Sequence, residues 1–118
     1  MQIKAIEFIE QERIEKEFKK VVKKEKSFEK TFNIFKKSLL IENNIYSKVR
    51  ISNSFKIIDK THCDKKQFWK AYIRDSKYDR MIRIIFFIQK NVLYIIEIFH
   101  KDFKDNCDYI LLKKYCDF

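Results

Sequence analysis

The side chains in this sequence that are best suited to chemistry are cationic, and they gather in its second half. Lys70 and Arg74 alternate with apolar residues in one segment, and Arg83 is the one charged residue in the next, apolar segment. His100 and Lys101 end a third apolar segment. Ammonium and guanidinium groups bind phosphates, and an imidazole exchanges a proton near neutral pH. The pattern predicts a site for a polyanion, with His100 available as an acid or base.

Each of these residues also has a structural interpretation that the sequence leaves open. Arg83 could support the sheet by pairing with Glu97 or Asp79 instead of binding a ligand. Independently of that, Lys70 and Arg74 could form an ordinary solvated face. His100 could be a histidine at a strand end with no further role.

The overall charge favours the first interpretation. The chain has 118 residues, with 27 Lys and Arg against 17 Asp and Glu, which gives a net charge of +10. The segment from Lys48 to Arg83 holds eleven basic and four acidic residues, a net of +7, whereas the first 40 residues hold a net of +4. Codon bias accounts for part of the lysine content. Clustered cations release counterions from nucleic acid, so we expect contact with RNA or the ribosome.

The composition excludes several classes of protein. The chain contains no glycine and no proline, so it has no phosphate-cradling glycine-rich loop, no dinucleotide fingerprint and no G-x-S-x-G elbow. A hydrophobic content of 46% is too high for a disordered chain. The length suits one domain, which we place over residues 1–118.

The cysteines and the ends of the apolar segments indicate a simple cellular context. Cys63, Cys107 and Cys116 are odd in number and lack metal-ligand spacing, so we expect incidental thiols, a reduced protein and no metal site. The N-terminus has no long apolar stretch typical of a signal peptide. The longest apolar run, 84–88, is far shorter than a membrane span. We therefore expect a soluble cytoplasmic protein without membrane contact.

The first half of the chain has helical periodicity. Residues 3–9 are either a first strand or the first turns of a helix. Two apolar stripes on charged segments then predict helices over 12–27 and 28–42, most simply an antiparallel pair, with one continuous helix as the alternative. The second stripe is aromatic and predicts core: Phe28, Phe32, Phe35 and Leu39.

The second half changes to strand periodicity. Residues 45–66 predict a basic loop with one strand near 54–59. In 68–74 the odd residues face the core, and Lys70, Tyr72 and Arg74 form a cationic outer face.

Residues 81–88 are β-branched and aromatic, which predicts a central strand. A polar turn over 75–79 precedes it. A tight turn follows over 89–91, where Asn91 suits a left-handed backbone, and 92–100 is the next strand. A short helix over 105–116 ends the chain. The order βααβββ with a C-terminal helix predicts an α+β domain in which two N-terminal helices pack on a small antiparallel sheet.

This order, and the segments Phe68–Arg74, Arg83–Ile88 and Val92–Lys101, resemble the RelE/ParE superfamily of bacterial and archaeal toxins. That family typically has a basic strand, a strand of the form Y-R-hydrophobic-hydrophobic-Y, a turn, and an apolar strand that ends in His or Tyr and Lys or Arg. Ile82 stands where the family usually has tyrosine. The segment 45–66 is also longer than in compact members.

The resemblance implies a toxin of a toxin–antitoxin pair. RelE-like members are ribosome-dependent endoribonucleases that cut mRNA in the A site, and ParE-like members poison DNA gyrase without that activity. Both are held inactive by a cognate antitoxin protein, and neither needs a metal or cofactor. We expect a metal-independent mRNA endoribonuclease that contacts mRNA and ribosomal RNA. A ParE-like gyrase inhibitor is the alternative.

The resemblance also implies roles for individual residues. Arg83 matches the strand arginine and would hold the scissile phosphate, while His100 and Lys101 end the last strand near the mouth of the site. Tyr109 lies roughly where the family places a stacking or proton-transferring tyrosine, although it also suits helix packing. The implied catalytic set is Lys70, Arg74, Arg83, His100, Lys101 and Tyr109.

Overall fold

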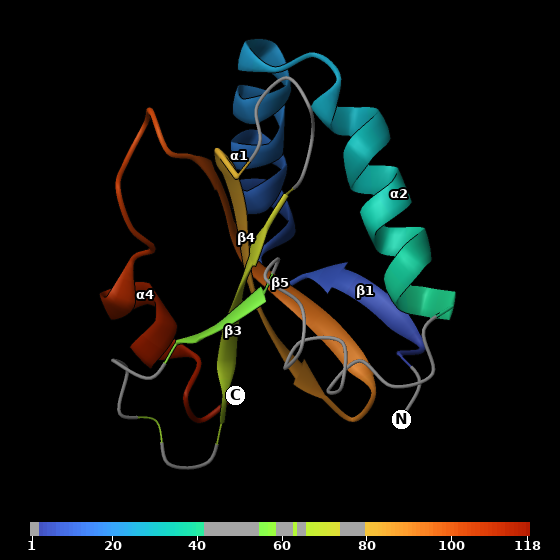
Figure 1. Cartoon of the computed structure of the whole chain (residues 1–118). Coiled ribbons are helices and arrows are strands. Elements are labelled where there is room, and N and C mark those ends of the chain that lie inside the picture. The colour runs from blue at the N-terminus through green and yellow to red at the C-terminus, as the bar shows by residue number, and fades with distance from the viewer. Residues whose placement is uncertain (1–2, 42–54, 59–62, 64–65, 74–79) are drawn as a thin grey trace.

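The computed structural model describes residues 3–41, 55–58, 63, 66–73 and 80–118, and shows one sheet with helices on both of its faces (Figure 1). The elements are β1 (Ala5–Phe8), α1 (Gln11–Lys24), α2 (Phe28–Ile41), β2 (Phe55–Ile58), β3 (Phe68–Tyr72), β4 (Ile82–Gln89), β5 (Val92–His100) and α4 (Tyr109–Lys114). The α+β class is confirmed. None of the described helices is long and apolar enough to cross a membrane.

The sheet differs from the predicted one in strand number and in strand direction. Its order is β1-β5-β4-β3-β2, and β1 runs parallel to β5 while the other pairs are antiparallel. The sheet is therefore mixed, because the chain between β1 and β5 is long enough to bring β5 back beside β1 in the same direction, which a short turn cannot do. The strand expected near 54–59 exists as β2 and joins the edge, so the order βααβββ gains a fourth strand after the helices.

The boundaries of most predicted elements hold. Two separate helices confirm the antiparallel pair, and β4 lies in the middle of the sheet as expected. In the β4–β5 turn Lys90 and Asn91 both have left-handed backbones, with φ of 52° and 67°. Two left-handed residues in succession make the hairpin turn that matches strand twist. The polar turn predicted over 75–79 lies outside the described residues.

The C-terminal helix is shorter than predicted because it is capped inside the expected range. Asp108 is the N-cap, and its carboxylate accepts a hydrogen bond from the Leu111 N–H at 3.1 Å. An Asp in this position satisfies a backbone donor that the first turn leaves unpaired. Residues 105–108 therefore precede the helix as an irregular segment.

The larger core lies between the sheet and the helix pair α1 and α2, on what we call the helix-pair face. Phe18, Phe28 and Phe32 contact one another with ring centroids 5.1 to 5.6 Å apart. Beneath them β3 and β4 contribute Trp69 and Phe86, whose centroids are 5.6 Å apart. The phenylalanine stripe of α2 is thus core, as its spacing predicted. Burying each such ring stabilises the fold by about 1.5–3 kcal/mol.

A β-bulge in β5 changes which side chains face that core. Ile85 pairs with Glu97, but the next residue of β4 pairs with Ile95, so Ile96 is an extra residue. After such a bulge the alternation of side chains is shifted by one. Ile96 and Glu97 consequently both lie on the opposite face of the sheet.

Side chains of α1 stabilise this part of β5 beyond the end of β1. β1 pairs with β5 only as far as Ile95. From there Arg13 donates a hydrogen bond from Nη2 to the Ile96 carbonyl at 2.7 Å, and the Ile98 N–H donates to Glu17 Oε1 at 2.9 Å. Burial raises the pKa of Glu17, and the hydrogen bond from Ile98 opposes that effect. Two helical side chains thereby replace the missing strand partner.

The smaller core lies on the other side of the sheet, on what we call the α4 face. It joins Phe68, Phe87 and Phe99 of the strands to Leu112 and Tyr115 of the C-terminal segment. This layer corrects the prediction of a solvated cationic face on β3. Lys70 is only 7% exposed, because its face of β3 is shared with this second core.

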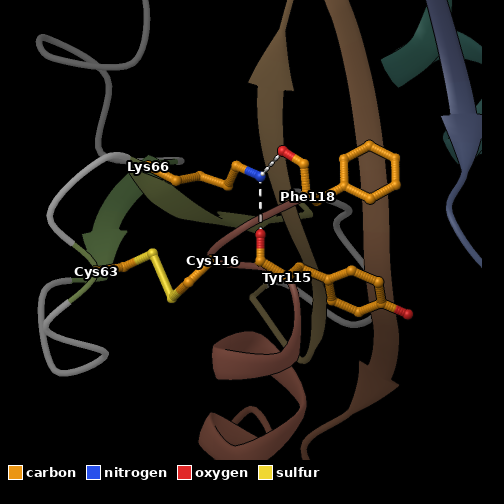
Figure 2. Close-up of a disulfide and its surroundings, with 5 residues drawn as sticks. All are labelled: Cys63, Lys66, Tyr115, Cys116 and Phe118. Carbon is orange, nitrogen blue, oxygen red and sulfur yellow. Dashed lines mark hydrogen bonds between the residues drawn. A yellow bond between two sulfur atoms is a disulfide. The ribbon is translucent and has the colours of Figure 1, made fainter.

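The structure also corrects the expectation of three free thiols. Cys63 and Cys116 form a disulfide with their Cα atoms 5.7 Å apart (Figure 2). Cys107 remains free and buried. The two residues are 53 positions apart in the sequence, so spacing alone could not pair them.

Candidate nucleic-acid interface

Four side chains meet where β3 ends and β4 begins, on the α4 face. Tyr72 pairs with Arg83 across the two strands. The Arg80 and Arg83 guanidinium carbons lie 4.6 and 5.0 Å from the Tyr72 ring centroid, and Lys70 Nζ lies 6.0 Å from it. We call Lys70, Tyr72, Arg80 and Arg83 the cationic cluster. Three cations around one aromatic ring form an arrangement that stacks on bases and attracts phosphates.

Among the described residues, Arg83 is held by a backbone group and not by a carboxylate. Its Nη1 donates to the Asp105 carbonyl at 3.1 Å, and its Nε makes no hydrogen bond within the described residues. Glu97 does not pair with it. That carboxylate is taken by Lys104 and by the Asp108 N–H, the latter at 3.1 Å. The structural pairing with Glu97 is therefore wrong, and Asp79 lies outside the described residues.

Arg80 enters the cluster through an unusual backbone conformation. Its φ is 64°, which places a bulky residue in the left-handed region. Its N–H donates to the Ile73 carbonyl at 3.0 Å and closes the connection between β3 and β4. A non-glycine residue in this region costs about 1–2 kcal/mol. Such strain is concentrated at functional sites, where it directs a side chain.

The cluster carries a local excess of positive charge. Lys70, Arg80 and Arg83 take part in none of the ion pairs formed within the described part of the chain. Lys70 is largely buried, Arg83 is half-buried and Arg80 is exposed, so the positive charge extends from the core to the surface. Partial burial weakens screening by solvent and strengthens attraction for an anion.

His100 does not join this cluster, because the bulge turns it to the helix-pair face. It pairs with Ile82 and is 1% exposed. Its Nε2 lies 3.4 Å from the carboxylate of Glu25, just after α1, and its Nδ1 accepts a hydrogen bond from the Asp102 N–H at 3.0 Å. Arg83, next to Ile82, faces the other way. The predicted site is thus divided between the two faces of the sheet.

The remaining predicted residues lie at different distances from the cluster. Lys101 is exposed, and its N–H donates to the Met81 carbonyl at 2.8 Å, one residue from Arg80. Tyr109 begins α4 on the cluster's side of the sheet and is half-buried. Arg74 lies outside the described residues.

A buried thiol connects Tyr109 with Lys70. Burial raises the pKa of Cys107, while the positive charge of Lys70 and a hydrogen bond from Tyr109 lower it. Both residues therefore lie close to the same sulfur, beneath the irregular segment that precedes α4. Three of the six predicted residues therefore lie on one face of the sheet: Lys70, Arg83 and Tyr109.

The predicted catalytic set did not include two members of the cluster, Tyr72 and Arg80. Alternation along 68–74 did place Tyr72 beside Lys70, and the cross-strand pairing to Arg83 then brings the ring between the cations. Arg80 gave no such signal, because a left-handed residue is normally announced by glycine or asparagine. Only the backbone reveals its position.

Comparisons with protein-family models, with curated proteins and with solved structures find no match to this chain. Among the described residues no three His, Cys, Asp or Glu side chains are grouped so that they could hold a metal ion. The side chains of the cluster themselves are suited to phosphate binding, aromatic stacking and proton exchange by Lys and Tyr.

Proposed function

We propose that this chain is the toxin of a toxin–antitoxin pair and cleaves mRNA on the ribosome, as RelE-like toxins do. The observation that carries the proposal is the cationic cluster: two guanidinium groups and one ammonium group around Tyr72, without a carboxylate partner in the described chain. A cytoplasmic location follows from this role. The net charge of +10 supports a polyanionic partner such as RNA.

The cluster is suited to grip RNA at one phosphate and one base. Arg83 and Arg80 have donors in fork geometry, which matches the oxygens of a phosphate. Tyr72 provides a ring on which an unstacked base can lie, a common way in which proteins hold single-stranded RNA. The strained backbone of Arg80 supports a functional use of its side chain.

The proposed reaction needs no cofactor. The 2′-oxygen of RNA forms a bond to the adjacent phosphorus, and the bond from phosphorus to the 5′-oxygen breaks. A base removes the 2′ proton, an acid protonates the leaving oxygen, and cations stabilise the charged phosphorane. In this proposal Arg83 and Arg80 provide the stabilisation. The proton-bearing groups on that face are Lys70, Tyr72 and Tyr109, and His100 acts only on the fold.

One observation favours the alternative, a ParE-like gyrase inhibitor that binds without catalysis. The imidazole expected at the site lies buried on the opposite face, 3.4 Å from Glu25. A cluster of cations without that acid or base still binds an acidic surface. In both cases a cognate antitoxin is the expected partner.

Controlled expression followed by primer extension on ribosome-bound transcripts tests the proposal. We expect the wild type to arrest growth and to produce cuts within codons. Arg83→Ala should abolish both, while Lys30→Ala, which removes an exposed charge on α2, should leave both unchanged. Circular dichroism of each purified variant checks that its fold is retained.

Three outcomes would decide against this function. Intact mRNA together with an induced DNA-damage response would support gyrase inhibition. Cleavage that persists in a folded Arg83→Ala variant would place the site elsewhere. Absence of any growth effect, with no small open reading frame beside the gene, would favour a nucleic-acid-binding domain with no toxin role.

A further inference from the structure

In addition to the peptide chain itself, one covalent cross-link attaches the C-terminal segment to the rest of the molecule. The disulfide joins Cys116, two residues after α4, to Cys63, which precedes β3 in the chain. Figure 2 shows the bond beside Lys66, Tyr115 and Phe118. The bond therefore closes a long loop across the α4 face.

Besides the disulfide, Lys66 and two aromatic rings of the sheet contact the last residues. Lys66 Nζ donates to the backbone carbonyls of Tyr115 and Phe118, at 2.7 and 2.9 Å (Figure 2). The Phe118 ring lies 5.6 Å from the ring of Phe87 and 5.3 Å from that of Tyr94, yet it is 52% exposed. The ammonium group of Lys66, the half-exposed ring of Phe118 and the buried ring of Tyr115 thus supplement the disulfide.

The helix itself contributes little to its own stability. α4 has six residues, whereas isolated helices shorter than roughly 12–15 residues are marginal in water. Of its residues only Leu112 is fully buried, and Ile110 is 83% exposed. Its order therefore depends on docking against the sheet, through Leu112 and the neighbouring Tyr115.

The three cysteines differ in their access to an external thiol. Cys63 and Cys116 are both half-buried, so a reductant in solution can reach their bond. Cys107 is 4% exposed, and burial raises the pKa of its thiol, which lowers its reactivity. Exchange is therefore confined to one pair of sulfurs.

We propose that Cys63–Cys116 is a reversible thiol–disulfide exchange site, and that reduction by a dithiol releases the segment 109–118 from the sheet. A thiolate of the dithiol attacks one sulfur, the S–S bond breaks, and the other cysteine leaves as a thiolate that takes up a proton. The second thiolate of the dithiol then resolves the mixed disulfide. Two electrons and two protons pass to the protein, and the dithiol becomes a disulfide.

Hydrogen exchange on the full-length protein, with and without dithiothreitol, tests this inference. The amides of Tyr115, Cys116 and Phe118 donate within the C-terminal segment and report its order. We expect their exchange to become faster by about tenfold or more after reduction, with α1 and α2 unchanged. Mass spectrometry after alkylation should count one free thiol before reduction and three after it.

Two variants provide matched controls. Cys63→Ser with Cys116→Ser should show the fast exchange with or without dithiothreitol. Cys107→Ser should respond to the dithiol as the wild type does. Equal protection of 109–118 before and after complete reduction of the wild type would overturn the proposal, and so would a disulfide that resists the dithiol in the native protein. Both readouts use the wild type, so they stand even if a variant fails to fold.

Discussion

The two faces of the sheet differ in how they are held together and in what they expose. The helix-pair face is covered by two 14-residue helices over interlocking aromatic rings, and it buries His100 completely. The α4 face is covered by a six-residue helix, which is supported by a disulfide and by the hydrogen bonds of Lys66. This face ends in the cationic cluster. The first face stabilises the domain, and the second carries the groups suited to binding RNA.

The position of a residue along a strand does not by itself determine whether the residue lies at a site. Arg83 of β4 and His100 of β5 lie at the same end of the sheet. The resemblance to the RelE/ParE superfamily predicted them in one site. One extra residue in β5 sends them to opposite faces. Variants that change one face at a time should therefore have different effects on stability and on RNA binding.

The largest effect on stability should come from the helix-pair face. Phe32→Ala removes a ring that is 2% exposed and contacts Phe18, Phe28 and Phe35. We expect a loss of about 3–5 kcal/mol in the free energy of unfolding, measured by urea denaturation. RNA binding per folded molecule should not change. A loss below about 1 kcal/mol would show that the aromatic stack is not the main support of the fold.

A matched pair of glycine substitutions separates strain from function. Arg80→Gly and Lys90→Gly each remove one cation and relieve one left-handed backbone, with φ of 64° and 52°. Each should stabilise the fold by up to about 1 kcal/mol in urea titrations. Only Arg80→Gly should weaken RNA binding, because Lys90 lies at the far end of the β4–β5 hairpin. Equal weakening by both would mean that general charge, not the cluster, binds RNA.

A smaller effect concerns Glu10, whose ion pair with Lys114 connects the two faces. Glu10 precedes α1 and accepts hydrogen bonds from Arg13 and from Lys114 of α4, and these bonds, the one from Lys114 first, lower its pKa from 4.5 to about 2. A carboxylate with a depressed folded pKa contributes stability above its unfolded pKa and loses it as the pH falls through the folded value. The contribution should therefore disappear between pH 4.5 and about 2.

Glu10→Gln checks this contribution. The variant should have a lower melting temperature than the wild type at pH 7, and the difference should shrink as the pH approaches 2. A gap that stays constant from pH 7 to pH 2 would show that the carboxylate charge does not stabilise the contact between α1 and α4.

Much of the fold followed from sequence periodicity. The aromatic stripe of α2, the central strand β4 and the left-handed Asn91 were all predicted, because each depends on local pattern and burial. The parallel pairing of β1 with β5 was not, since it depends on where a long connection returns. The bulge at Ile96 carries no local signal, because its support comes from Arg13 and Glu17 more than 80 residues away.

The candidate site was predicted in part for the same reason. Lys70, Arg83 and Tyr109 do lie on one face, and strand alternation is enough to place the first. His100 was misplaced relative to them because a count of alternate residues assumes an unbroken strand. The disulfide was missed because pairing needs proximity in space, which spacing does not provide.

The most direct test of the cationic cluster is the salt dependence of binding to a single-stranded RNA, compared between the wild type and Arg83→Ala. Loss of one phosphate contact should reduce the slope of log affinity against log salt by about 0.7. Affinity at low salt should fall by about tenfold or more, since hydrogen bonds to a charged group contribute about 1.5–3 kcal/mol. A folded Arg83→Ala variant that has the slope and affinity of the wild type would contradict the proposal that the α4 face binds RNA.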